Sequence, residues 1–414
     1  APRLVYFEGK LYPLPLNNPL VDGALNFPLL SWPGKIRAAL GALGVPFVLR
    51  PYEGEGEESI QGFITRHLGA EVFAKVIDPF VSGVYAGDPD KLAMKWALKK
   101  IHNLEEKGPN AGLLGGGLER FAELQAEKKT DEFKAKWREG AQLMAERVQG
   151  GALGSFRKGL QALPIAVAEK LGVEKVQTGM TLRRIAQKEG GGYLCTFAQA
   201  GGGEAEVACK AAALTIPSHA YESILSGLPG AETLLAALAK VRYPAVASVT
   251  LAYPTSELAP EYGGGLSGFG HLIPRSQKVR TLGAICPSSL FPYRAPPGWT
   301  MILSYIGGSR DPTLGQLPED EIVKIVDGDI KRVLMKQGST VQPKVLGCRV
   351  WGKAIPQYEK GHGQVLAALE AFEALNPGLF LGGNYRTGVA FGDCVAFGID
   401  EAARIATALP SLRA

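Results

Sequence analysis

Helix-type and strand-type patterns of hydrophobic residues alternate along this chain. Apolar residues recur every three or four positions, which predicts helices, at 34–43, 59–68, 70–80, 91–104, 118–149, 160–171, 231–240, 319–335, 364–375 and 395–409. Period-two runs bounded by turn residues predict strands at 4–6 and 10–12, 180–186, 192–197, 206–216, several within 245–305, and 344–350. Residues 80–89 are predicted to be either a tight loop between helices or a segment whose small residues let the backbone pack closely against a helix or a flat ligand. The mixture predicts an α+β or α/β protein.

The stretch from Leu379 to Cys394 has the pattern of a strand, a glycine-rich turn and the start of a helix. Gly382 and Gly383 let the backbone approach a ligand, and Asp393 can cap a helix whose first N–H groups favour an anion such as pyrophosphate. The predicted helix carries an apolar stripe of Val395, Ile399, Ala402, Ile405, Ala406 and Leu409. These residues alone allow two interpretations of the segment: half of a dinucleotide-binding site, or an ordinary helix packed against the core.

A second glycine cluster, residues 263–268, fits the pattern Gly-x-Gly-x-x-Gly. The residues after it, 269–274, form a strand-like run that ends at Pro274, whereas a dinucleotide fingerprint must lead into a helix. We therefore interpret this cluster as a loop.

Composition excludes several classes of function. The chain has 414 residues, enough for two or three domains, and 46% hydrophobic with 21% charged residues is ordinary for a globular protein. A net charge of +5 without a basic stripe does not indicate nucleic-acid binding. The five cysteines and five histidines lack metal-ligand spacing, so we expect neither a zinc site nor a disulfide framework. No motif of a hydrolase or a Walker loop occurs, which favours chemistry carried by a cofactor.

Seven blocks of the sequence resemble the protoporphyrinogen oxidase family, the oxygen-dependent FAD enzymes of haem and chlorophyll synthesis, and most closely its plastid form. The blocks occur in the family's order and extend over the whole chain. They are FVSGVYAGDP, GSFRKGLQALP, GFGHLIPRS, LGAICPSSLFPYRAPPG, YIGGSRDP, RVWGKAIPQY and LFLGGNYRTGVAFGDCV.

The resemblance implies an FAD-dependent amine oxidase-like fold with an incomplete Rossmann-type FAD domain, a mixed β-sheet substrate domain and a helical, membrane-associated domain. The implied boundaries are 1–33 for a substrate-domain hairpin, 34–153 for the helical domain, 154–217 and 344–414 for FAD-associated segments, and 218–343 for the substrate-binding sheet. The implied reaction is six-electron oxidation of protoporphyrinogen IX to protoporphyrin IX, with O2 as acceptor and release of hydrogen peroxide.

The family's site residues can be placed on matching positions of this chain. Arg3 matches an arginine that binds a propionate of the tetrapyrrole, Phe291 an aromatic residue that stacks on a pyrrole ring, and Val246 and Leu272 the aliphatic walls. Gly83 matches a position in the family's helical domain where the backbone comes close to the substrate site. The implied flavin contacts are Leu182, Trp351, Gly382, Gly383, Asn384, Val389, Ala390 and Phe391. Leu182 and Trp351 are equally compatible with plain core positions.

The family begins with a βαβ unit that holds the adenosine and pyrophosphate of FAD, and this sequence starts after that unit. We expect that an N-terminal portion is missing and that the residues of this sequence alone bind FAD weakly or not at all. Two explanations remain. Either the protein is an enzyme whose N-terminal part is absent from this sequence, or it is an FAD-less homologue that serves as a structural or tetrapyrrole-binding subunit of a plastid membrane complex. We favour the enzyme, because the residues on the substrate side remain close to the family type.

The resemblance also implies that the protein is in the chloroplast and binds peripherally to the thylakoid or envelope membrane through residues 34–150. It leaves open whether the protein forms a homodimer or joins a membrane complex. The sequence has no apolar run of about eighteen residues and no signal pattern at its start.

Overall fold

The computed structural model describes residues 2–14, 26–46, 48–107, 112–127, 154–262 and 265–412. They form two compact units, each built from separate parts of the chain. The first unit combines residues 1–121 with 242–362, and the second combines 122–241 with 363–414. The expected helix at 118–149 lies outside the described residues beyond Glu127, as does part of the loop expected at 263–268.

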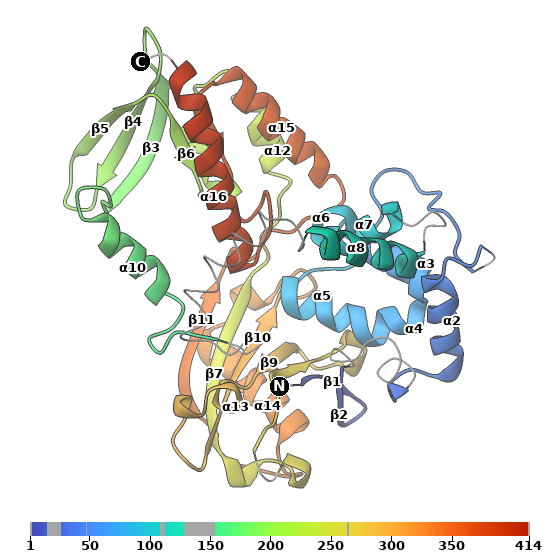
Figure 1. Cartoon of the computed structure of the whole chain (residues 1–414). Helices are drawn as coiled ribbons and strands as arrows, with labels where there is room; N and C mark the ends of the chain where they lie inside the picture. Colours follow the sequence, from blue (N-terminus) through green and yellow to red (C-terminus); the bar gives the residue numbers. More distant parts are fainter. Residues whose placement is uncertain are drawn as a thin grey trace. The chain divides into compact units, whose positions relative to one another are not determined.

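A seven-stranded mixed sheet is the centre of the first unit (Figure 1). Its order is β11-β7-β10-β9-β8-β1-β2. The strands are β1 (Arg3–Phe7), β2 (Lys10–Pro13), β7 (Val246–Pro254), β8 (Gly270–Leu272), β9 (Thr281–Ile285), β10 (Trp299–Gly307) and β11 (Lys344–Trp351). The predicted opening hairpin is confirmed, with Glu8 and Gly9 both at positive φ in its two-residue turn. β1 runs parallel to β8, so the start of the chain joins strands that come over 260 residues later.

The two faces of this sheet differ in burial because side chains alternate along each strand. One face packs against α14 (Glu319–Leu334) and forms the main core, to which β10 contributes Ile302 and Ile306 and α14 contributes Ile322 and Val326. The opposite face of β10 is only half-buried. The sheet is therefore sealed by α14 on one side and leaves a less covered surface on the other.

The first third of the chain forms helices, of which the one at residues 78–85 contacts β8 and β9. These helices are α2 (Trp32–Ala42), α3 (Ile60–Leu68), α4 (Ala70–Val72), a π-helical turn at Phe73–Ile77, α5 (Asp78–Tyr85), α6 (Met94–Ala97), α7 (Lys99–Lys107) and α8 (Leu113–Glu127). Ser59 caps α3 by accepting a hydrogen bond from the Gly62 N–H at 3.0 Å. The loop predicted at 80–89 is wrong in its first half, because α5 continues to Tyr85 and ends at Ala86, which has φ +49°.

The described residues of the second unit form two small sheets and four longer helices. β3 (Met180–Gln187), β4 (Tyr193–Gln199) and β5 (Glu204–Cys209) form an antiparallel meander, and β6 (Ala212–Leu214) pairs in parallel with β12 (Leu379–Leu381). The strand predicted at 206–216 is thus two strands, broken by a bend after Cys209. The helices are α10 (Ala162–Leu171), α12 (Ala231–Leu238), α15 (His362–Leu375) and α16 (Phe391–Ala408).

The C-terminal helix α16 differs from its prediction in two respects. Its N-cap is Ala390, and no side chain caps it, so the expected cap from Asp393 is wrong: Asp393 lies in the first turn instead. Of the two alternatives left open by the sequence, the ordinary packed helix does not describe the apolar stripe, since Val395 is 45% and Ile399 66% exposed, while Phe397 is turned inward. Periodicity located the helix correctly but did not identify its covered side.

Candidate functional site

The backbone of α5 comes unusually close to the sheet at Gly83. A methyl group placed on Gly83 would lie 2.3 Å from Cδ2 of Leu272 on β8, well inside van der Waals contact. The structure therefore brings together two of the predicted substrate-site residues. Gly283 on β9 lies opposite Leu272 in the register, and its own absent side chain gives Leu272 further room.

The half-buried face of the sheet extends from Leu272 across three more strands. We define this surface, called the half-buried face below, by Ser248, Thr250, Leu272, Ile285, Leu303 and Tyr305. Strand register places these side chains on one side, since Leu303 pairs with Ile285 and Thr250, and Tyr305 with Ser248. The sequence argument identified only Leu272 among them. The signal that could have found the others is the strict alternation within β10 once its buried side is known.

Arg3 begins β1 and is exposed, with its guanidinium carbon 5.4 Å from the centre of the Phe269 ring. The Phe269 N–H donates to the Pro2 carbonyl at 2.8 Å, and the Cys286 N–H donates to the Phe269 carbonyl at 2.9 Å. This ladder holds Arg3 at the start of β1, beside β8. A free cationic side chain at an apolar surface can bind a carboxylate.

Phe291 follows β9 and the short helix α13 (Pro287–Leu290). Its ring is half-buried and lies 6.0 Å from the ring of Tyr293, and the guanidinium carbon of Arg294 lies 5.9 Å from its centre. The short helix is tied to the same corner as Arg3, because the Gly268 N–H donates to Ser289 Oγ at 3.0 Å. An aromatic side chain and a cation thus occur on one anchored loop.

Val246 and Trp351 are paired residues at the ends of β7 and β11. Val246 is 5% exposed and packs with Ala86 and Leu282, so it supports the sheet from within a small cluster. Trp351 is 43% exposed, which leaves its ring available to a ligand. Both belong to the first unit, whereas the other predicted flavin residues belong to the second.

Buried hydrogen bonds hold the glycine turn that follows β12. Tyr385 is fully buried, and its hydroxyl and that of Tyr221 are 2.9 Å apart. Tyr221 in turn donates to the Leu214 carbonyl of β6 at 3.0 Å. Gly382 lacks room for any side chain, since a Cβ there would lie 2.0 Å from the Phe397 ring. Gly383, at φ +127°, adopts a conformation that only glycine accepts readily.

Glu373 of α15 fixes the same turn by charge. It accepts the Leu381 N–H at 2.7 Å and pairs with Arg386 at 2.7 Å and with Arg404 at 2.9 Å. Burial alone raises the pKa of this carboxyl, but the hydrogen bonds from Arg404 and Arg386 outweigh burial and hold the pKa below its usual range. Arg386 also donates to the Leu381 carbonyl. Sequence reasoning missed these residues because Glu373 lies on a different helix.

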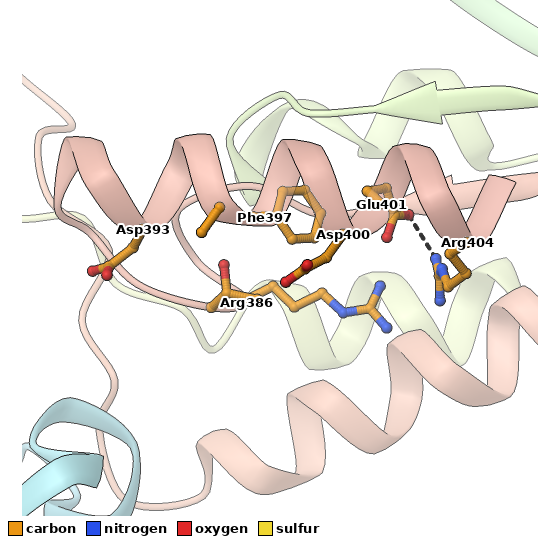
Figure 2. A pocket seen from close by; sticks show the side chains of 8 residues that line it. Arg386, Asp393, Phe397, Asp400, Glu401 and Arg404 are labelled. Carbon is orange, nitrogen blue, oxygen red and sulfur yellow. Dashed lines mark hydrogen bonds and ion pairs between the residues drawn. The ribbon is translucent and has the colours of Figure 1, made fainter. Parts of the chain in front are cut away.

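A cavity of about 330 Å³ lies between this turn and α16 (Figure 2). Arg386 extends along the helix, and Glu401 pairs with Arg404 at 2.7 Å at the far end. Carboxylates of Asp393 and Asp400 also line it. Because acidic groups outnumber basic ones there, the cavity itself does not favour a pyrophosphate.

The first turn of α16 lies beside the glycine turn. Val389 is half-buried, whereas Ala390 and Phe391 are exposed, and Asn384 is half-buried within the turn. Since no side chain caps α16, backbone N–H groups of its first turn are free to donate to a ligand oxygen. Leu182 is half-buried on β3, in the meander, next to a register shift.

Other kinds of site are not indicated in the described parts of the chain. No cluster of three or more histidine, cysteine, aspartate or glutamate side chains there is arranged to hold a metal ion. None of the described helices is long and apolar enough to cross a bilayer.

Comparison with known proteins gives consistent matches along the whole length. Residues 1–406 match the family of flavin containing amine oxidoreductases. Protoporphyrinogen oxidase 1, chloroplastic, of Spinacia oleracea is 43% identical over 98% of this chain and 69% of its own length. The chloroplastic protoporphyrinogen oxidase of Oryza sativa subsp. japonica is 42% identical over 98% and 72%. The crystal structure of cyclohexylamine oxidase from Brevibacterium oxydans superposes with a TM-score of 0.55 at 13% identity, over 99% of this chain and 81% of that one.

Proposed function

Because the chain belongs to the flavin containing amine oxidoreductase family, and within it to the protoporphyrinogen oxidases, we propose that it oxidises protoporphyrinogen IX to protoporphyrin IX with FAD. The observation that carries this proposal is the 43% identity to a chloroplastic relative over nearly the whole chain. The half-buried face supports it, since Leu272, Ile285 and Leu303 offer apolar surface to a flat, largely apolar substrate.

The residues at the glycine turn fit one side of a flavin. Gly382 and Gly383 present backbone without side chains, and the first turn of α16 presents N–H donors that lack a cap. These donors suit a carbonyl oxygen of the flavin ring. We propose that Gly382, Gly383, Asn384, Val389, Ala390 and Phe391 hold this side of the cofactor, with Leu182 and Trp351 as further contacts.

The chain's own side chains bind and orient the substrate. When bound, FAD supplies hydride-accepting chemistry, and O2 is the final acceptor that leaves as hydrogen peroxide. Phe291 stacks on a pyrrole ring of the tetrapyrrole, and Arg3 holds a propionate by charge-assisted hydrogen bonds. Val246 and Leu272 form the aliphatic walls of the site. Gly83 supports this site by leaving space for Leu272. No acid or base residue is needed, because solvent and tautomerisation of the substrate complete the proton transfers.

The experiment is an aerobic turnover assay of the protein purified from its native source, with added FAD, because these residues alone are expected to bind FAD weakly or not at all. Protoporphyrinogen IX is supplied, and the fluorescence of the product is followed together with oxygen uptake. We expect product fluorescence and oxygen uptake to rise faster than they do by spontaneous oxidation, and neither to rise in the absence of oxygen. Coproporphyrinogen III, with four propionates, is the matched substrate control. Binding of the tetrapyrrole without turnover by FAD-loaded protein would instead support a non-catalytic subunit.

We also propose a peripheral membrane contact through α2 and α8. On α2, Trp32, Ile36 and Leu43 are 65%, 56% and 58% exposed, and their spacing places them on one side of the helix. On α8, Leu118 and Phe121 are 63% and 61% exposed. The residues that flank the two helices are close, because a Cβ on Gly112, directly before α8, would lie 2.9 Å from the nitrogen of Gly44, which follows the end of α2. Exposed apolar stripes on helices are suited to the interface of a bilayer.

This contact can be tested by co-sedimentation with vesicles of galactolipids and phosphatidylglycerol, the chemistry expected for a plastid membrane. The double change Ile36→Ser and Leu43→Ser should weaken binding about tenfold or more, since each removes buried apolar area. Val173→Ser alters a side chain that is 87% exposed in the second unit and serves as the control. Equal binding by all three proteins would contradict a contact through α2.

A further inference from the structure

Two cysteines of the second unit lie close enough to react with each other. The sulfur atoms of Cys195 and Cys209 are 3.9 Å apart, and both residues are free thiols. Cys195 is in β4 and lies opposite Val207, two residues before Cys209 on β5. Because side chains alternate, Cys209 is on the same face of the meander as Val207 and is therefore a diagonal neighbour of Cys195.

The local structure allows the two sulfur atoms to close to bonding distance. A disulfide has an S–S length of about 2.05 Å, so the atoms must approach by about 1.9 Å. β5 is at the edge of the order β3-β4-β5, and Cys209 is its last residue, directly before the bend that leads to β6. The end of an edge strand is held by one neighbouring strand only, so rotation of both side chains and a small shift of this end can supply the movement.

The two thiols differ in their access to solvent. Cys195 is 6% exposed, and burial, with a smaller effect from Cys209, raises the pKa of its thiol to about 12. Cys209 is only partly buried. A small oxidant from solvent therefore meets Cys209 first, and Cys195 is placed behind it as the second thiol.

We propose that Cys195 and Cys209 form a reversible disulfide, with hydrogen peroxide as the oxidant. Peroxide takes two electrons from the Cys209 thiolate, which becomes a sulfenic acid as hydroxide leaves. The Cys195 sulfur then attacks the Cys209 sulfur, the S–O bond breaks, and the Cys195 proton leaves with that oxygen as water. In total, two thiols and one peroxide give one disulfide and two waters. A dithiol reverses the step.

The position of this pair connects it to the segment that carries the glycine turn. Tyr193, the register partner of Cys209, donates its hydroxyl to the Pro377 carbonyl at 3.0 Å. The Ala212 N–H, three residues after Cys209, donates to the Gly378 carbonyl at 2.8 Å. Gly378 leads directly into β12 and then Gly382. A bond at Cys209 thus restrains the connection from the meander to β6 and β12.

The test is thiol counting and peptide mapping of the purified full chain after limited hydrogen peroxide. Two of the five thiols should be lost, the mass should fall by about 2 Da, and a linked peptide should join Cys195 to Cys209, all reversed by dithiothreitol. The matched control Cys348→Ser should form the same link, whereas Cys195→Ser should leave a sulfenic acid on Cys209 that dimedone traps. Retention of all five thiols in the wild-type chain, a link between other cysteines, or sulfinic acid at Cys209 without a link would each overturn the proposal. This result does not depend on FAD or on turnover.

Discussion

The contact between Gly83 and Leu272 allows a quantitative test of the substrate side of the first unit. In Gly83→Ala the new methyl group would be 2.3 Å from Leu272 Cδ2, whereas unstrained carbon contacts are about 3.5–4.0 Å. The end of Leu272 must therefore move by about 1.2–1.7 Å, or α5 must lift from the sheet. Such overpacking costs about 1–3 kcal/mol. Alanine also favours the helix over glycine by about 0.5–1 kcal/mol, which partly offsets this cost.

A double-mutant cycle separates these two effects. In the Leu272→Ala background the obstructing atom is gone, and the next neighbour, the Leu282 carbonyl oxygen, is 4.0 Å away. There Gly83→Ala should be stabilising by about 0.5–1 kcal/mol, so the coupling energy between the positions should be about 1–3 kcal/mol. Urea unfolding followed by circular dichroism measures it, and the KM for the tetrapyrrole should rise in the single Gly83→Ala variant. Equal stability effects in both backgrounds, within about 0.5 kcal/mol, would refute the close approach.

Three further predictions concern charged and titrating groups. Arg3→Ala should weaken tetrapyrrole binding by about 1.5–3 kcal/mol in a fluorescence titration, whereas Arg3→Lys should keep part of the affinity; unchanged binding would remove Arg3 from the site. Burial lowers the pKa of His271 to about 4, so the unfolded chain binds a proton at higher pH than the folded chain does. The free energy of unfolding should therefore fall by about 3 kcal/mol between pH 6.5 and 4. His271→Phe should lack that loss when unfolding is measured across the range. Glu373→Gln should destabilise the second unit by about 2 kcal/mol. It should also remove a stabilisation that is complete above pH 4.5 and is lost as the pH falls through the lowered pKa of Glu373. Thermal unfolding with and without the substitution, at pH 7 and pH 3.5, measures both effects.

Local patterns predicted most of the elements, because turns and periodicity are properties of short segments. Ser59 was correctly expected at the start of a helix, and the hairpin around Gly9 was predicted from its turn residues. The end of α5 was missed, because the small residues around Gly83 resemble a loop by propensity while the packing of α5 against β8 and β9 keeps them helical. Propensity is a weak prior when tertiary contacts compete with it.

The candidate site was predictable only where a resemblance supplied it. Nothing local distinguishes Tyr305 on the half-buried face from Ile306 on the core face, because the choice depends on which side α14 covers. Likewise, the ion pairs of Glu373 join α15 to residues that come 13 and 31 positions later, and no spacing rule links them. Conversely, Asp393 fits the rule for a helix cap, yet α16 begins three residues earlier than that rule required.

The parallel pairing of β1 with β8 has a consequence for how this chain is made. Arg3 meets Gly270 in the sheet, so the first strand leaves the ribosome 267 residues before its partner. At about 5–20 residues per second the delay is roughly 15–50 s. Through that interval one edge of the opening hairpin is an unpaired template for other strands. Efficient synthesis of this protein therefore depends on protecting its first strand during translation, and slowing elongation between residues 14 and 270 should increase aggregation.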